Sequence, residues 1–241
     1  MMDDSEYESM ARVEATHPWF VNRRRLIRGL VRQFASHLVR PHVLDAGCGT
    51  GTNLAEYARF GPAVGIELEP ETAAISAGRG QHVLVGDLAS LPFKSGSFDL
   101  VISTDVIEHI ENDVAALTEL RRVLAPSGRI LATTPAYSWA YSDHDRCLHH
   151  VRRYDRRHLH EAFGRARLRV IHSARYNVVL AAPVLLARLL RRRGSGSDVA
   201  RPIPRLVAPA LDLLWHIEAS LAQRLDLRAG LTHVAVLAHA D

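Results

Sequence analysis

The sequence predicts an α/β protein with a mostly parallel sheet and helices on both of its faces. Short apolar runs of strand length alternate with helical patterns over the first 135 residues, and the connections between them are short. A glycine-rich turn follows the first apolar run, as in sheets of this kind that bind ligands. With 47% hydrophobic residues, the 241-residue chain can bury a core as one domain.

The first expected helix covers residues 12–39, where apolar residues recur at helical spacing and Thr16 or the next turn begins the helix. Five strands then alternate with three helices, the last of them capped by Asn112. The expected strands are HVLDA, AVGIEL, HVLVGDL, FDLVIST and GRILATTP, and the helices are NLAEYARF, PETAAISA and DVAALTELRRVL.

The second half adds a helix that Asp155 caps and that runs to about Phe163, then the strands LRVIHSARY and THVAVLAHA. An apolar helix, the basic linker RRRGSGSD and an amphipathic helix lie between these two strands. A single domain therefore has five parts: an N-terminal helical cap at 1–39, a core at 40–135, a loop, helix and sixth strand at 136–176, a helical insertion at 177–230 and a last strand at 231–241.

Charge is distributed unevenly along the chain. The first 145 residues hold 13 basic and 19 acidic residues, a balance of −6, whereas the rest holds 17 arginines and 7 acidic residues, a balance of +10. Arginine suits carboxylate and phosphate, so an anionic substrate, a lipid surface or nucleic acid is indicated; a solvated face is the alternative. Two cysteines and a polar, acidic start indicate the cytoplasm.

A glycine loop with the pattern Asp-x-Gly-x-Gly-x-Gly runs from Asp45 to Gly51. Such a turn lets the backbone approach a ligand closely, and an acid about 20 residues further on, here Glu67, suits a ribose hydroxyl pair. The loop predicts an adenosine-containing ligand on a Rossmann-like sheet. Its spacing differs from the Gly-x-Gly-x-x-Gly of nicotinamide enzymes, which disfavours an oxidoreductase.

Four segments in order resemble the successive motifs of the class I S-adenosylmethionine (SAM)-dependent methyltransferases, in their small-molecule type 11-like branch. They are VLDAGCGTG, GIELEP, VGDLASLPFKSGSFDLVISTDVIEHI and LAPSGRILATTP. The resemblance implies a seven-stranded Rossmann-like sheet with an antiparallel last strand and a helical insertion between strands six and seven. It also implies SAM as the cofactor and S-adenosylhomocysteine as its product.

The resemblance further implies roles for individual residues on the cofactor side. The loop packs on the methionine part of SAM, Asp45 supports its amino group, Glu67 holds the ribose, Leu68 and Leu88 flank the adenine, Asp87 accepts from the adenine amino group and Thr104 lies near the reacting end. The N-terminal THPWFVNRRRL resembles the same branch, with Trp19 over the cofactor and Arg23 or Arg24 at its carboxylate. The implied cofactor-binding residues are Trp19, Arg23, Asp45, Gly47, Cys48, Gly49, Gly51, Glu67, Leu68, Asp87, Leu88 and Thr104.

The segment after the fifth strand is expected to overhang the acceptor pocket, because ligands of this fold bind beyond the carboxyl ends of the strands. His144, Asp145 and His149 are the candidate bases for an acceptor proton. The pattern His-x-Arg-Arg-Tyr-Asp at 150–155 again resembles the type 11-like branch. Substrate binding is expected of Tyr137, Trp139, Tyr141, Arg152, Arg153 and Tyr154. For the first three of these, packing onto the sheet is the alternative.

No metal is expected, since neither the thiolates of a structural zinc site nor a His-Glu-x-x-His pattern occurs. Glu108 and His109 form the Glu-His pair common in the family, where the histidine is read as structural; a base or metal role is the alternative. Cys48, between glycines, is interpreted as a small packed residue rather than a nucleophile.

The predicted function is SAM-dependent methyl transfer to an oxygen, nitrogen or carbon of a small, lipophilic or anionic molecule. One alternative is an RNA methyltransferase, although STDVIEH is not the Asp/Asn-Pro-Pro-aromatic motif of base amino methylation. A second alternative is a non-catalytic SAM-binding partner or regulator. Peripheral membrane contact through residues 178–193 and a homodimer are further expectations, and nucleic acid is not an expected partner.

Overall fold

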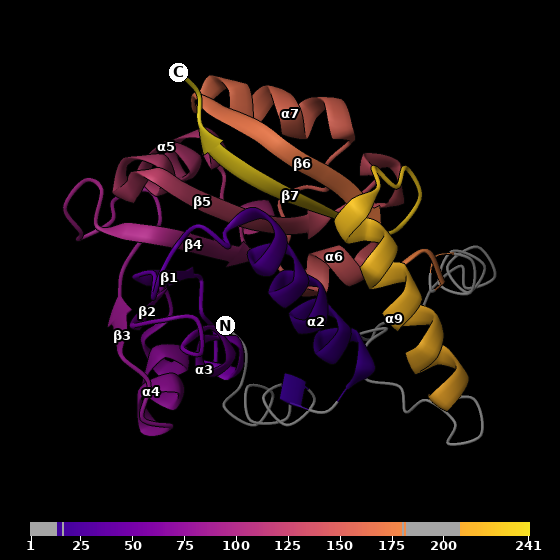
Figure 1. Ribbon diagram of the computed structural model, residues 1–241, viewed down its shortest axis with the longest axis horizontal. Helices are drawn as coiled ribbons and strands as arrows, with labels where there is room; N and C mark the ends of the chain where they lie inside the picture. Colours follow the sequence, from indigo (N-terminus) through magenta and orange to yellow (C-terminus); the bar gives the residue numbers. More distant parts are fainter. Residues whose placement is uncertain (1–13, 16, 180, 182–207) are drawn as a thin grey trace.

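The computed structural model describes residues 14–15, 17–179, 181 and 208–241. Its centre is a seven-stranded sheet of order β3-β2-β1-β4-β5-β7-β6 (Figure 1). The strands β1 to β5 pair in parallel, and β7 is antiparallel to both β5 and β6, as the resemblance implied. The strands are β1 Val43–Ala46, β2 Ala63–Glu67, β3 Val83–Val85, β4 Phe98–Thr104, β5 Leu124–Pro135, β6 Leu168–Tyr176 and β7 Thr232–His239.

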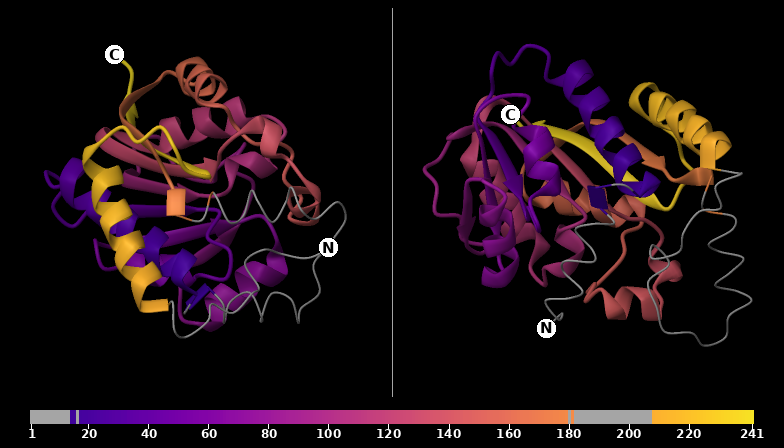
Figure 2. Two further views of the ribbon diagram at one scale, coloured as in Figure 1. Left: turned by 90° about the vertical axis from the view of Figure 1, so that its right-hand side faces the viewer. Right: turned by 90° about the horizontal axis from the view of Figure 1, so that it is seen from below.

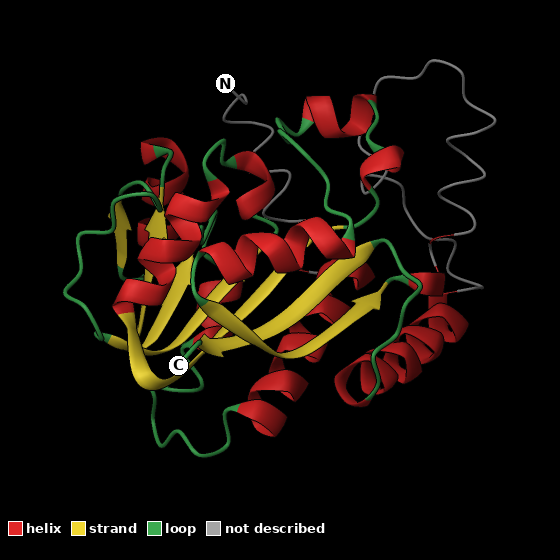
Figure 3. Ribbon diagram, turned by 90° about the horizontal axis from the view of Figure 1, so that it is seen from above, coloured by secondary structure: helices red, strands yellow, loops and turns green. Residues whose placement is uncertain are grey.

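Helices cover both faces of the sheet (Figures 2 and 3). They are α2 Pro18–Phe34, α3 Thr52–Tyr57, α4 Pro70–Gly78, α5 Asp113–Val123, α6 Asp143–Cys147, α7 Arg156–Arg165 and α9 Ala208–Arg224. Two short 3₁₀ helices, η1 Ile107–His109 and η2 Ser138–Ala140, follow the carboxyl ends of β4 and β5. These turns therefore lie at the edge of the sheet where a ligand is expected.

The central strands are rich in apolar residues, as expected for a sheet that is buried on both faces. Successive side chains of a strand point to opposite faces, so Val101 joins the core under α5 and α7, while Leu100 and Ile102 join the core under α2 and α9. Leu120 and Phe163 close the first core and Leu30 closes the second. The two cores hold the carboxyl ends of β1, β2 and β4 in a fixed relation.

Two predicted strand boundaries and one predicted helix cap differ in the structure. Strand β3 ends at Val85, so Asp87 lies in the loop after it. Strand β5 begins at Leu124 rather than at Gly128, because a register shift lets Leu124 pair with Phe98. Asp155 occupies the N-cap position of α7 but makes no side-chain cap, since its carboxylate accepts hydrogen bonds from Ser138 instead.

The first helix, predicted over 12–39, is confirmed over Pro18–Phe34 and ends before the predicted bound, at the C-cap Ala35. His17 is its N-cap and accepts a hydrogen bond from the backbone N–H of Trp19 at 3.2 Å. The alternative start at Thr16 lies outside the described residues, and so do residue 180 and residues 182–207 of the predicted insertion. The amphipathic part of the insertion forms α9, which packs beside α2. Among the helices described, none has the length and apolar character needed to cross a membrane.

Candidate cofactor and acceptor site

The loop after β1 requires glycine at the positions that the pattern indicated. Gly47, Gly49 and Gly51 have φ values of 80°, 53° and 81°, which other residues rarely adopt. A Cβ on Gly47 would lie 2.5 Å from a methyl carbon of Val106, and one on Gly51 would lie 2.1 Å from the hydroxyl of Ser76. The loop is thus a tight strand-to-helix turn with its backbone close to its neighbours.

Asp45, in β1 before the loop, is a buried acid that its surroundings do not neutralise. Its side chain is 1% exposed, and neither carboxylate oxygen has a hydrogen-bond partner among the described residues. Burial raises the pKa of Asp45 to about 8; Arg23 opposes this rise, and Glu67 adds to it. A buried carboxylate of this kind fits an incoming cation such as the ammonium group of SAM.

Glu67 lies at the end of β2 against the glycine loop. Its carboxylate accepts hydrogen bonds from the backbone N–H of Gly49 and of Leu68, both at 2.9 Å. Leu68 next to it is 58% exposed, an apolar surface available to a flat ring. Asp87 is exposed and accepts from the backbone N–H of Ala89 at 2.8 Å, and Leu88 is buried. These positions match the ribose and adenine roles that the resemblance implied, and the roles stay predictions.

Arg23 reaches this edge of the sheet from α2 and forms an ion pair with Asp105, and its predicted contact with the cofactor stays a prediction. Asp105 follows Thr104 with a φ of 55°, and its second carboxylate oxygen accepts a hydrogen bond from the hydroxyl of Thr133 at 2.8 Å. The sequence analysis named Thr104, which is buried at the end of β4, but missed Asp105. The signal for Asp105 was its place directly after a buried strand.

The N-terminal segment also contacts the glycine loop. The hydroxyl of Thr50 donates to the carboxylate of Glu14 at 2.8 Å, and Arg24 donates to the carbonyl oxygen of Glu14 at 2.8 Å. Arg24 is therefore occupied by the backbone of this segment. Trp19 is partly buried in the first turn of α2, and its predicted position over the cofactor stays a prediction.

The thiol of Cys48 is 5% exposed, and burial together with Asp45 and Glu67 raises its pKa. It is therefore a packed thiol rather than a thiolate nucleophile. The polar groups fit SAM: a buried acid for the ammonium group, a second acid at the end of β2 for the ribose, and a buried arginine whose Nε has no hydrogen-bond partner among the described residues, for the carboxylate.

The segment after β5 presents aromatic side chains at the same edge of the sheet. Tyr137 and Trp139 lie with ring centroids 5.5 Å apart, and Trp139 is 68% exposed. The guanidinium of Arg175 lies 4.4 Å from the centroid of the Tyr137 ring. Tyr141 instead links the two ends of the segment, because its hydroxyl donates a hydrogen bond to the carbonyl oxygen of His150 at 2.8 Å. Of the three predicted aromatic residues, Trp139 is the most exposed, and substrate binding by the three stays a prediction.

Asp145 does not have the surroundings of a general base, which corrects the prediction. It is fully buried; one oxygen contacts Nδ1 of His150 at 2.9 Å and Nε of Arg153 at 2.7 Å, and the other accepts from the backbone N–H of Ser142 at 2.9 Å. Burial acts to raise the pKa of Asp145, but these partners outweigh it and hold the pKa well below its usual range. Asp145 orders the loop.

The predicted substrate ligands Arg152, Arg153 and Tyr154 are also engaged within the protein. Arg152 pairs with Asp113 at 3.0 Å, and the buried Tyr154 donates to the same carboxylate at 2.7 Å. Arg153 pairs with Asp145 and is 9% exposed. The pattern His-x-Arg-Arg-Tyr-Asp therefore fastens the loop to α5 and α6, and substrate contact has no support in this geometry.

His144 and His149 remain the base candidates. His144 lies on α6 and is partly buried, and His149 is exposed with a φ of 56°. Glu108 and His109, in η1, face the same loop, since the backbone N–H of Val151 donates to the carbonyl oxygen of Glu108 at 2.8 Å.

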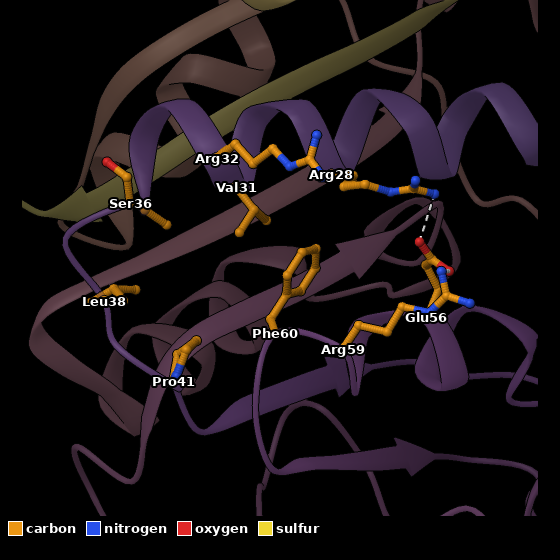
Figure 4. Close-up of a pocket in the computed structure, with 10 residues that line it drawn as sticks. Arg28, Val31, Arg32, Ser36, Leu38, Pro41, Glu56, Arg59 and Phe60 are labelled. Carbon is orange, nitrogen blue, oxygen red and sulfur yellow. Dashed lines mark ion pairs between the residues drawn. The ribbon is translucent and has the colours of Figure 1, made fainter.

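A hollow lies away from these residues (Figure 4). It has a volume of about 450 Å³ and is lined by one side of α2, by the end of α3 and by the segment before β1. Arg28 and Glu56 form an ion pair of 2.6 Å at its rim. It adjoins Pro41 and Phe60, which precede β1 and β2, so it lies at the opposite edge of the sheet from Asp45.

Comparison with known proteins agrees with the motifs. Residues 44–132 match the family model described as "Methyltransferase domain". "Probable tRNA methyltransferase 9B" of Mus musculus is 34% identical over 138 residues, which cover 55% of this chain and 30% of that protein. "Malonyl-[acyl-carrier protein] O-methyltransferase" of Herminiimonas arsenicoxydans is 39% identical over 95 residues, covering 38% of this chain and 36% of that protein. The chain thus matches about a third of the length of these relatives.

Among solved structures, a SAM-dependent methyltransferase of Thermotoga maritima, described as a "possible histamine N-methyltransferase", aligns with a TM-score of 0.61 at 17% identity. The alignment covers 97% of this chain and 94% of the other, and at this identity it shows the shared fold. The strand order agrees with this shared methyltransferase fold, and the family match gives the core of the chain, residues 44–132, the sequence of a methyltransferase domain.

Proposed function

We propose that this protein transfers the methyl group of SAM to a small, anionic or lipophilic molecule bound beyond the carboxyl end of β5. The observation that carries the proposal is Asp45, a buried acid with no hydrogen-bond partner among the described residues, next to a loop whose three glycines have positive φ values. SAM supplies a methyl group on a sulfonium centre. The chain has to hold the ligand, align the acceptor and exclude water.

The acceptor side supports a small ligand. Trp139 offers an exposed aromatic face, and Arg175 beside Tyr137 supplies positive charge at the end of β6. An exposed ring and an arginine suit an acceptor with both an apolar body and an acidic group. His144 is the proposed base for an acceptor hydroxyl, because Asp145 is fully engaged and an amine acceptor needs no base.

RNA is the second candidate acceptor. The similarity to the mouse protein named as a probable tRNA methyltransferase favours it, as does the excess of arginine after residue 145. A protein that binds RNA through several phosphates loses affinity steeply with salt. The salt dependence of tRNA binding therefore separates the two acceptors.

The test begins with calorimetry of SAM and S-adenosylhomocysteine binding to the wild type and to Glu67→Gln. SAM should bind to the wild type and roughly tenfold or more weakly to Glu67→Gln, since the amide cannot accept both ribose hydroxyl protons. The protein is then incubated with methyl-labelled SAM and either total tRNA or an ultrafiltered metabolite extract. Label in the metabolite fraction supports the proposal, and label in tRNA supports the alternative. SAM binding without label in either fraction indicates a non-catalytic SAM-binding protein, and no binding of SAM refutes the proposal.

A further inference from the structure

Glu108, His109 and His150 bring one carboxylate and two imidazoles together beside the acceptor loop. One ligand atom from each of the three residues lies within 4.8 Å of the others. Glu108 and His109 belong to η1, whereas His150 lies between α6 and α7. The backbone hydrogen bond from Val151 to Glu108 fixes the two segments side by side. The cluster is therefore built by the fold and not by neighbours in sequence.

Glu108 is fully buried and only half satisfied. Its Oε2 atom accepts a hydrogen bond from the hydroxyl of Thr134 at 3.2 Å, while Oε1 is buried with no hydrogen-bond partner in the described part of the chain. A buried carboxylate oxygen without a donor costs free energy, and a bound cation is one established way to offset that cost. The second histidine of the cluster provides an independent indication.

His150 is oriented as a metal-binding histidine is. Its Nδ1 atom contacts Asp145 at 2.9 Å, which leaves Nε2 as the ring nitrogen for a ligand. Asp145 itself is fixed by Arg153 at 2.7 Å and by Ser142 at 2.9 Å. In many metal sites a carboxylate accepts a hydrogen bond from the ring nitrogen of the histidine that does not bind the metal.

His109 completes the set. Its ring lies edge-on to that of His150 with 4.8 Å between the centroids, and the backbone of His149 provides its hydrogen-bond partner. His109 is exposed, so a cation can enter from solvent. Each of the two histidines thus has one ring nitrogen engaged by the protein.

We propose that Glu108, His109 and His150 bind one divalent transition-metal ion of the zinc class, with Asp145 positioning His150. Two imidazoles and a carboxylate suit Zn²⁺, Co²⁺ or Fe²⁺, and they leave coordination positions open. Ligand atoms around a tetrahedral zinc ion lie about 3.3 Å apart, so the outermost atoms must approach each other by roughly 1.5 Å. Small side-chain rotations supply that change. No metal was expected from the sequence because zinc thiolates and a His-Glu-x-x-His pattern are absent, and because His150 is distant in sequence from Glu108 and His109.

The ion would lie on the acceptor side of the cofactor site. Asp105, which pairs with Arg23, is close enough to Glu108 for its charge to raise the pKa of Glu108, after the larger effect of burial. An open coordination position there suits an oxygen of the acceptor, whose hydroxyl proton the ion would make more acidic. This role rests on the proposed methyl transfer, whereas the binding of the ion does not.

The test uses chelator-treated protein without an affinity tag, titrated with zinc chloride by calorimetry and with cobalt chloride by visible absorption. One ion should bind per chain, and Co²⁺ should give the absorption of a site with nitrogen ligands. Glu108→Gln and His150→Gln should each lower the affinity at least roughly tenfold. His158→Gln, an exposed histidine on α7 outside the cluster, is the matched control and should bind as the wild type does.

Circular dichroism will show whether Glu108→Gln or His150→Gln prevents folding. Two further variants test the proposal in that case. His109→Asn changes an exposed residue and should lose the ion with the fold intact. Cys147→Ser removes the exposed thiol of α6 and should retain the ion. Absence of Zn²⁺ and Co²⁺ binding to the wild type, or equal binding by His109→Asn and the wild type, overturns the proposal. SAM calorimetry on the same samples is separate: zinc binding without SAM binding refutes the proposed function and leaves the metal site standing.

Discussion

Replacing Asp45 with asparagine should make the stability of the ligand-free protein less dependent on pH. Burial raises the pKa of Asp45 to about 8 in the folded state, whereas the ordinary value is 3.8. Between these values the folded protein holds a proton that the unfolded chain has lost. Folded stability must therefore decrease as the pH rises through this window, and asparagine, which does not ionise, removes that decrease.

The size of the effect follows from proton linkage. A group that is protonated in the folded state and ionised in the unfolded state lowers the free energy of unfolding by about 1.4 kcal/mol for each pH unit. From pH 5 to pH 7 the wild type should lose about 3 kcal/mol relative to Asp45→Asn. For a chain of this length that difference corresponds to about 5–10 °C in Tm.

Thermal and urea unfolding followed by circular dichroism at pH 5, 6, 7 and 8, without SAM, measure this difference directly. Other titrating groups are common to both proteins and largely cancel in the comparison. Asp143→Asn, in which the lost carboxylate is exposed, controls for the removal of one negative charge. Parallel pH curves for the wild type and Asp45→Asn would refute the reasoning, because Asp45 would then ionise in the folded protein as it does in the unfolded chain.

Further predictions concern the ligand, the loop and the acceptor side. SAM binding at pH 7 should release up to about one proton, seen as a dependence of the binding enthalpy on buffer, because the ammonium group needs Asp45 ionised; equal enthalpies in all buffers contradict this. Gly51→Ala should weaken SAM binding in calorimetry and lower Tm, since its Cβ would lie 2.1 Å from a neighbouring hydroxyl and its φ is 81°; wild-type values for both would show that the turn tolerates a side chain. Arg153→Met should lower the free energy of unfolding, measured with urea, by about 3–5 kcal/mol, and its neighbour Arg152→Met by about 1 kcal/mol or less. The reason is that the first change alone removes the arginine partner of a fully buried carboxylate; equal losses would contradict the assigned burial. His144→Gln should leave SAM affinity unchanged and lower kcat for a hydroxyl acceptor; an unchanged kcat would remove it as the base.

The fold was predictable from the sequence because its signals are local. Strands β4 and β6 have the predicted bounds, and Asn112 accepts the predicted cap hydrogen bond from the backbone N–H of Ala115 at 3.1 Å. The early start of β5 was not predictable, because it depends on pairing with Phe98 on another strand. The side chain of Asp155 was misread for the same reason, since Ser138 competes successfully for its carboxylate.

The cofactor side was more predictable than the acceptor side. The glycine loop and the acids of β1 and β2 are fixed by short-range spacing, and the structure places Glu67 within hydrogen-bond distance of Gly49 in that loop. On the acceptor side the same residue types have structural or ligand-binding roles according to their partners. Asp145 is a residue type that can act as a base, but its contacts are those of a buried structural carboxylate. Glu108 and His150 come close to each other only in the folded chain.

The buried carboxylates at this edge of the sheet are of two kinds. Some form an ion pair with an arginine of the same chain, and others have no such partner among the described residues. Asp145 has Arg153, and its pKa is held low, so its charge is already compensated. Asp45 and Glu108 each keep an oxygen with no hydrogen-bond partner among the described residues, and burial raises the pKa of both. In their ionised form such groups destabilise the folded chain unless a cation from outside neutralises them. The ammonium group of SAM suits the first and a metal ion the second, so cofactor and metal would each stabilise the fold at its own acid.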